Sequence, residues 1–166
     1  LKDYISKSKT GSSLRLNKSW LILRDRKKWI LYQNKIRKTN TAIDDFGKYR
    51  LNNGSSLLLS KTDKPTFTKD KNKEVIDYEK VKNKNLKVRS WVYGDSFQPL
   101  GMHGKKKVSD FLIDNKIDCF EKQSQLVLTA NDDIIWLCGQ RISDKVKVTK
   151  NTSTMMELSY EKYVQL

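Results

Sequence analysis

The segment from residue 86 to residue 117 constrains the fold more than any other part of this sequence, because its local pattern changes twice over a short distance. Apolar and polar residues alternate from Leu86 to Val92, which predicts a half-buried strand. A run rich in glycine and proline follows, and it requires tight turns or close approach by another group. The residues of this run are Gly94, Pro99, Gly101 and Gly104.

A short amphipathic helix is predicted directly after this run, from Lys106 to Asn115. Apolar residues recur there at three- and four-residue spacing, as is typical of a helix with one buried face. The first turn would carry the three lysines at 105–107, whose charge is unfavourable at the positive end of a helix dipole. A bound anion would remove that conflict, since free backbone N–H groups at a helix start bind phosphate. The alternative for these lysines is a solvated run of charge.

Most of the remaining sequence predicts strands joined by polar turns. Three short strands near the start form an antiparallel meander, and an Asn53-Gly54 turn predicts a hairpin because this dipeptide favours the turn that matches strand twist. Two continuous apolar runs later in the chain predict a buried hairpin. The fold class is therefore α+β, mostly antiparallel β with a short helix near 106–115. The expected strands are 13–16, 20–23, 29–33, 46–51, 56–60, 125–128, 134–138, 146–149 and 155–160.

The chain is expected to contain two regions. The polar stretch Lys80–Asn85 marks a boundary, which gives a basic β-rich region at 1–82 and a second domain at 83–166. Residues 34–45 are polar and lead to no prediction of secondary structure.

The net charge of +15 is unevenly distributed. Residues 1–85 hold 22 Lys and Arg against 9 Asp and Glu, whereas residues 86–166 hold 12 against 10. A polyanion such as a nucleic acid would be attracted mainly by the first half, although a lysine-rich composition also arises without any ligand. No apolar run approaches the roughly 20 residues that cross a bilayer, so no membrane partner is expected.

Few residues offer catalytic or metal-binding chemistry. Cys119 and Cys138 are too few and too widely spaced for a disulfide framework or a metal site with His103, which indicates free thiols in a reducing, cytoplasmic compartment. Asp95 and Asp110 would serve as an acid-base pair, but a turn and a helix position explain them more simply. No nucleotide-binding glycine loop is present. We therefore expect no catalytic residue, no metal and no cofactor in this chain.

Three motifs in the second half resemble the C-terminal domain of bacterial tRNA(Ile)-lysidine synthetases. They are GDSFQPLGMHGKKKVSDFLIDNKI from Gly94, EKQSQLVL from Glu121, and DIIWLCGQRISDKVKVTKNT from Asp133. The first is similar to the family pattern GD-x-F-x-P-x-G-M-x-G-x-K-K-x-x-D-F. The resemblance covers about the last 80 residues, and the upstream half resembles the middle region of the same enzymes more weakly. The Ser-Gly-Gly-x-Asp-Ser phosphate loop that opens the family's catalytic domain does not occur in this sequence.

The resemblance implies a function for the chain. In these ligases an N-terminal ATPase domain uses ATP, Mg and lysine to convert the anticodon wobble cytidine of tRNA(Ile) to lysidine, while the C-terminal domain binds the acceptor stem. The chain, which begins at Leu1, would then be a non-catalytic fragment whose partners are the tRNA(Ile) acceptor stem, its own ATPase domain and a second copy in a homodimer. The implied RNA contacts are Lys105, Lys106, Lys107, Lys116 and Arg141.

Two arginines offer planar, bidentate contacts to phosphate. Arg89 lies on the strand expected after residue 86, and Arg141 follows Gly139. Arg141 has an alternative role as an ion-pair partner of Asp144 or Asp95. Two other functions remain open at this point: a basic β-rich interaction module with no RNA ligand, and a nonspecific RNA-binding domain with no catalytic partner.

Overall fold

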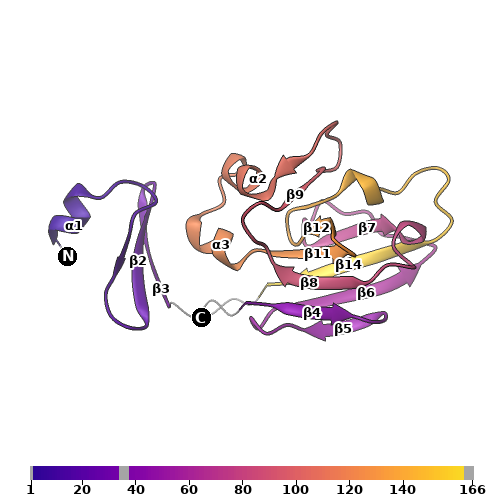
Figure 1. Ribbon diagram of the computed structural model, residues 1–166, viewed down its shortest axis with the longest axis horizontal. Coiled ribbons are helices and arrows are strands. Elements are labelled where there is room, and N and C mark those ends of the chain that lie inside the picture. Colours follow the sequence, from indigo (N-terminus) through magenta and orange to yellow (C-terminus); the bar gives the residue numbers. More distant parts are fainter. Residues whose placement is uncertain (1, 34–37, 163–166) are drawn as a thin grey trace.

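A computed structural model describes residues 2–33 and 38–162 of the chain. The first of these ranges contains the short helix α1 (Lys2–Lys7) and a three-stranded antiparallel sheet of β1 (Ser13–Arg15), β2 (Trp20–Asp25) and β3 (Lys28–Gln33). The predicted meander is confirmed, with the two hairpin registers centred on β2. We call residues 2–33 the N-terminal unit and residues 38–162 the body (Figure 1).

The N-terminal unit meets the body near α3 (Cys119–Ser124) (Figure 1). The ring of Tyr32 lies 4.9 Å from the ring of Phe120, centroid to centroid. Arg26 donates a hydrogen bond of 3.1 Å from Nη2 to the carbonyl oxygen of Lys116. These two contacts join strands β2–β3 and the turn between them to α3 and to the end of α2.

A five-stranded antiparallel sheet forms the centre of the body, in the order β13-β12-β11-β8-β4. Its strand β8 (Leu86–Ser90) confirms the predicted strand, and the hairpin of β11 (Leu126–Ala130) and β12 (Asp133–Leu137) confirms the predicted buried pair. The short β13 (Arg141–Ile142) closes one edge. The other edge is β4 (Asn40–Ile43), which was not predicted because it is short, follows a polar stretch and pairs with β8, which is distant in sequence.

A second, four-stranded antiparallel sheet has the order β5-β6-β14-β7. The hairpin of β5 (Gly47–Arg50) and β6 (Ser56–Thr62) is confirmed, and Gly54 in its turn has a φ of 89°, which suits glycine. The last strand, β14 (Met155–Glu161), lies between β6 and β7 (Lys73–Asp77). The C-terminal strand is therefore held by two strands from the first half of the chain.

The two sheets enclose the main core. Side chains of both sheets share one cluster, with Val88 and Leu128 from the first and Leu57 and Leu158 from the second. In the β11–β12 pair, Leu128 lies opposite Trp136 and Thr129 opposite Ile134, so Ile135 is the extra residue of a β-bulge. The bulge lets Ile135 and Trp136 both enter this core, while Ile134 and Leu137 pack in a second cluster.

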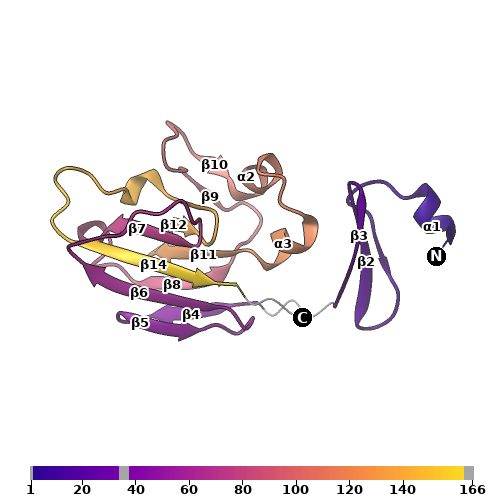
Figure 2. The same ribbon diagram turned by 180° about the vertical axis from the view of Figure 1, so that it is seen from behind.

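The second cluster lies under α2 (Val108–Asp114), which supplies Val108, Phe111 and Leu112. A two-stranded ribbon of β9 (Ser96–Phe97) and β10 (Lys106–Lys107) leads into this helix. Both views show α2 and α3 on the side of the body away from β4 and β5 (Figures 1 and 2). Two 3-10 turns complete the described elements: η1 (Tyr78–Lys80) and η2 (Asp144–Val146). The α+β, mainly antiparallel prediction is confirmed.

Three expectations from the sequence need correction. Strand pairing crosses the expected boundary at 82–83, since β4 pairs with β8 and β14 pairs with β6 and β7, so 83–166 does not stand apart from 38–82. The expected strand at 146–149 is wrong, because η2 occupies its start and no strand neighbours it. The helix begins at Val108 and not at Lys106, because pairing with β9 holds Lys106 and Lys107 extended.

Two further observations limit the chemistry. Cys119 and Cys138 are free, and burial raises the pKa of the Cys138 thiol. Within the ranges 2–33 and 38–162, no helix is long and apolar enough to cross a bilayer, and no three metal-ligating side chains lie together.

Candidate nucleic-acid interface

The lysines at 105–107 lie before the helix and not in its first turn. Lys107 has extended dihedrals, with φ −62° and ψ 139°, and no side chain caps the helix start. Alternation along β10 sends Lys106 to an ion pair with Asp114, while Lys105 and Lys107 remain exposed. The three lysines therefore precede the seven-residue helix, and their contact with phosphate stays a prediction.

Arg89 is engaged within the protein. Its Nη1 and Nη2 lie 2.8 and 2.9 Å from the two carboxylate oxygens of Asp95, which also accepts the Val92 N–H at 2.8 Å. Burial alone would raise the pKa of Asp95, but the hydrogen bonds and charge of Arg89 hold it below its usual value. Arg89 therefore fixes the turn at 92–95 and is not free for a bidentate contact to phosphate.

Arg141 and Lys116 lie apart from the other predicted contacts. Arg141 donates to the Leu100 carbonyl oxygen at 3.3 Å, and its charge partly offsets the burial that raises the pKa of Glu74. Neither Asp144 nor Asp95 pairs with it in the described chain. Lys116 follows α2 with a φ of 57° and faces the N-terminal unit through its carbonyl. The predicted residues thus do not converge on one site.

Lys105 does lie near other lysines, which were missed from the sequence because they come from distant segments. Lys145 Nζ lies 2.8 Å from Asp133 Oδ1; this hydrogen bond, with the charges of Lys84 and Lys105, lowers the pKa of Asp133. On the same 3-10 turn, Asp144 pairs with Lys147 at 2.9 Å. We call this set the lysine edge: Lys80, Lys84, Lys105, Lys145 and Lys147.

Hydrogen bonds tie the lysine edge to its scaffold. Lys80 donates to the Lys147 carbonyl oxygen at 3.0 Å, and its Nζ lies 3.8 Å from Asp77. The pKa of Asp144 is lowered first by the N–H of Gly101 and then by Lys147, which shows that the glycine-rich loop packs against η2. Five cations surround three carboxylates, so positive charge remains for phosphate groups.

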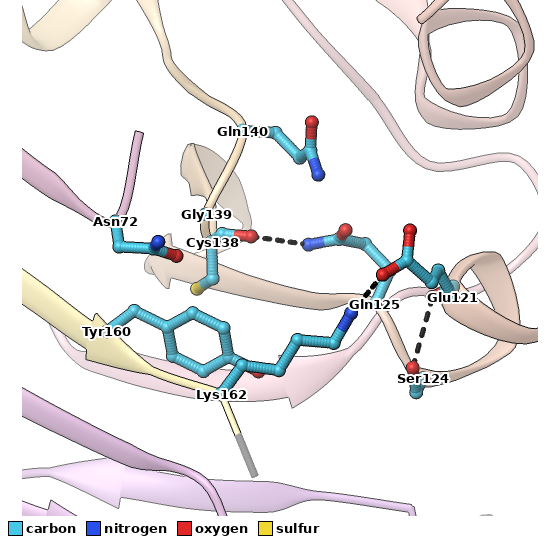
Figure 3. Close-up of a pocket in the computed structure, with 9 residues that line it drawn as sticks. All are labelled: Asn72, Glu121, Ser124, Gln125, Cys138, Gly139, Gln140, Tyr160 and Lys162. Carbon is cyan, nitrogen blue, oxygen red and sulfur yellow. Dashed lines mark hydrogen bonds and ion pairs between the residues drawn. The ribbon is translucent and has the colours of Figure 1, made fainter. Parts of the chain in front are cut away.

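A polar pocket lies elsewhere on the body, between β14, α3 and the β12–β13 turn (Figure 3). Its volume is about 200 Å³. Its floor contains the buried residues Gln125, Cys138 and Tyr160, and an ion pair between Glu121 and Lys162 stands at its rim. The sequence offered no signal for this pocket, because its residues are spread from Asn72 to Lys162.

The comparison with known protein families identifies the second half of the chain. Residues 86–159 match the family model described as the TilS substrate C-terminal domain. The matched residues make up slightly less than half of the chain. The resemblance found in the sequence is thereby confirmed, and it includes β8 through most of β14.

Curated proteins similar to this chain include several tRNA(Ile)-lysidine synthases. One from Caldanaerobacter subterraneus is 34% identical over 74% of this chain and 25% of its own length. One from Bacteroides thetaiotaomicron is 36% identical over 55% of this chain and 22% of its own. One from Clostridium tetani is 32% identical over 75% of this chain and 27% of its own length. The chain thus spans about a quarter of the length of these relatives.

A solved structure shows the same fold. The crystal structure of a TilS C-terminal domain matches with a TM-score of 0.67 and 20% identity, over 78% of this chain and all of that one. A match of that extent includes residues before Leu86, in agreement with the strand pairing that joins 38–82 to the TilS domain.

Proposed function

We propose that this chain is the tRNA-binding C-terminal part of a tRNA(Ile)-lysidine synthetase and that it holds the acceptor stem. The observation that carries the proposal is the match of residues 86–159 to the TilS substrate C-terminal domain. The named relatives support it, and so does the lysine edge, which concentrates positive charge on the body. Lysines that contact phosphate position RNA without reading its sequence.

The complete enzyme would use ATP and lysine to convert the wobble cytidine of tRNA(Ile) to lysidine. ATP, Mg and lysine would be held by an N-terminal ATPase domain, since this sequence contains no nucleotide-binding loop. The chain's partners would be that domain, the tRNA(Ile) acceptor stem and a second copy in a homodimer, in the cytoplasm. The role of the present residues is to bind and orient the RNA.

The lysine edge suits an RNA duplex. A-form RNA offers its phosphates and 2′-hydroxyls, and proteins recognise it mostly by shape. Lys105 and Lys145 belong to the second half of the chain, and Lys80 and Lys84 bring charge from the first half to the same place. Lys107, Lys116 and Arg141 are also exposed and would contact the RNA outside this edge, whereas Arg89 would keep its structural role with Asp95.

The test is the salt dependence of RNA binding, measured by fluorescence anisotropy on an acceptor-stem hairpin. Replacing Lys84, Lys105 and Lys145 together by Ala is expected to lower the slope of log affinity against log salt by about 2, because each lost phosphate contact removes roughly 0.7 to 0.9. These side chains are exposed, so the thermal midpoint is expected to change little.

The matched control replaces Lys69, Lys71 and Lys73 by Ala. This variant loses the same charge, but at the N-terminal end of β7, whereas Lys80 of the lysine edge follows its C-terminal end. The control is expected to change the slope by less than half as much. Equal slopes for the two triple variants would reduce the lysine edge to a solvated surface and would move the interface elsewhere.

A second experiment tests whether nucleotide binding is confined to the proposed ATPase domain. Calorimetric titration of the chain with ATP and magnesium is expected to show no saturable binding, because the phosphate loop is absent from the sequence. Saturable micromolar binding would contradict the proposal that nucleotide chemistry resides outside this chain.

A further inference from the structure

The polar pocket has a fixed hydrogen-bond acceptor at its floor. Gln125 is 8% exposed, and its Nε2 donates to the carbonyl oxygens of Leu126 and Cys138, both at 2.8 Å. Because both partners are acceptors, the amide nitrogen must occupy this position, and the orientation of the amide is set. Figure 3 shows the amide oxygen pointing away from the Cys138 carbonyl. In the described chain this oxygen makes no hydrogen bond, and Gln125 lines the pocket.

A second acceptor lies on the other side of Cys138 and Gly139 from Gln125 (Figure 3). Asn72 donates from Nδ2 to Asp70 at 3.1 Å, which leaves its Oδ1 turned toward Gly139. A Cβ on Gly139 would lie 3.0 Å from that oxygen and 3.4 Å from the Tyr160 ring, and the φ of Gly139 is 71°. Glycine at this position therefore keeps the space between Asn72 and Tyr160 open.

The rim supplies charge of both signs. The Glu121 carboxylate adds further acceptor oxygens and pairs with Lys162. Gln140 lines the same rim, and its side chain makes no hydrogen bond with the described residues. The fixed groups at the floor are thus acceptors, while a cation stands at the mouth.

We propose that this pocket binds one unpaired nucleobase through its exocyclic amino group, cytosine N4 or adenine N6, at the single-stranded end of the RNA. The inference rests on the proposed function and deepens it. The amino group would donate to Gln125 Oε1, and Lys162 at the mouth would meet the phosphate of the same nucleotide.

Size and polarity favour this ligand over others. Pockets for drug-sized ligands span about 300 to 1,000 Å³, so a volume of about 200 Å³ suits one ring system and excludes a nucleoside triphosphate. Unstacked bases at RNA ends are recognised by hydrogen bonds on their Watson–Crick edges. Uracil presents a carbonyl oxygen where cytosine presents an amino group, and that oxygen would face Gln125 Oε1 without a proton between them.

The first test varies the RNA and leaves the protein unchanged. Three acceptor-stem hairpins are compared by anisotropy: one blunt, one with a 3′ overhang of cytidines and adenosine, and one with an overhang of uridines. The amino-bearing overhang is expected to bind about tenfold more tightly than the uridine overhang, which is the discrimination of one good base contact. Equal affinity for the two overhangs would overturn the proposal.

The second test varies the pocket. Gln140→Trp places a large ring at the rim and is expected to remove the preference between overhangs while leaving the blunt hairpin unaffected. Gln140→Ala, the matched control, leaves the pocket open and is expected to retain the preference. A preference that survives in Gln140→Trp, at an unchanged thermal midpoint, would place the base contact elsewhere.

These outcomes separate the two proposals. A blunt hairpin that binds, with no difference between overhangs, would overturn the pocket ligand and leave acceptor-stem binding intact. An overhang preference in RNAs whose stem contributes nothing to affinity would support the pocket and overturn the role of the lysine edge.

Discussion

The N-terminal unit and the body are both built from antiparallel strands, yet they bury very different amounts of apolar surface. In the N-terminal unit, Leu23 and Tyr32 are the buried apolar side chains among the described residues, whereas the body encloses a cluster between two sheets and another under α2. A sheet needs a second layer to bury its apolar face. The unit has a single sheet, which contacts α1 through Tyr4 and Trp29 and contacts the body through Tyr32 and Phe120.

Charge shows the opposite distribution. Residues 1–33 carry nine Lys and Arg against two Asp and Glu, which is a large surplus for so few residues. The N-terminal unit therefore contributes long-range attraction for a polyanion, while the body contributes the rigid scaffold that positions specific groups. The larger core therefore lies in the body, while the net charge per residue is higher in the N-terminal unit.

The largest expected effect concerns where the chain can be cut. A fragment of residues 83–166 is expected to lose cooperative folding, because β14 loses both of its neighbours and β8 loses β4. A fragment of residues 38–166 retains both sheets and is expected to unfold cooperatively. Thermal denaturation followed by circular dichroism distinguishes them; a cooperative transition in 83–166 would restore the two-region division expected from the sequence.

Truncating a core aromatic of the body is expected to have the next largest effect. Phe111 packs edge-on against Phe97 with ring centroids 5.4 Å apart, in the cluster beneath α2. Phe111→Ala is expected to lower the free energy of unfolding by about 3 to 5 kcal/mol, measured by urea denaturation. A loss below about 1 kcal/mol would mean that α2 contributes little to the body.

The Arg89–Asp95 pair is expected to contribute about 2 kcal/mol, since its removal leaves a partly buried cation and the Val92 N–H without a partner. The pKa of Asp95 is lower in the folded chain than in the unfolded one. Its stabilisation is therefore present above the unfolded pKa of about 4 and is lost as pH falls through the folded pKa.

Urea denaturation from pH 7 to pH 2.5 measures this effect. Asp95→Asn is expected to be less stable at neutral pH and to lose less stability on acidification than the unmodified chain. Parallel pH profiles for the two proteins would show that the pair does not account for the acid sensitivity.

The smallest effect is expected in the N-terminal unit. Tyr32→Ala removes the ring that meets Phe120, but the sheets of the body do not depend on it. We expect the main unfolding transition to shift by less than about 1 kcal/mol, while amide exchange in β2 and β3 accelerates. A shift as large as that of Phe111→Ala would show that the two parts unfold as one cooperative unit.

The sequence by itself determined the local elements of this protein. The β5–β6 hairpin follows from Asn53-Gly54, and the buried β11–β12 hairpin follows from two apolar runs around a polar turn. Both depend on interactions between residues close together in the chain, where turn chemistry and alternation decide the outcome. The motifs after Gly94 also carried the family resemblance that the TilS match confirms.

Tertiary structure alone decided which strands pair and which distant side chains meet. β4 became a strand because β8 offered it a free edge, and β14 joined β6 and β7 across the expected boundary. Pairing with β9 kept Lys106 and Lys107 out of the helix, and Arg89 forms an ion pair with Asp95. The lysine edge and the polar pocket likewise gather residues far apart in sequence, because hydrogen bonds and charge interactions depend on distance in space, which local sequence patterns do not encode.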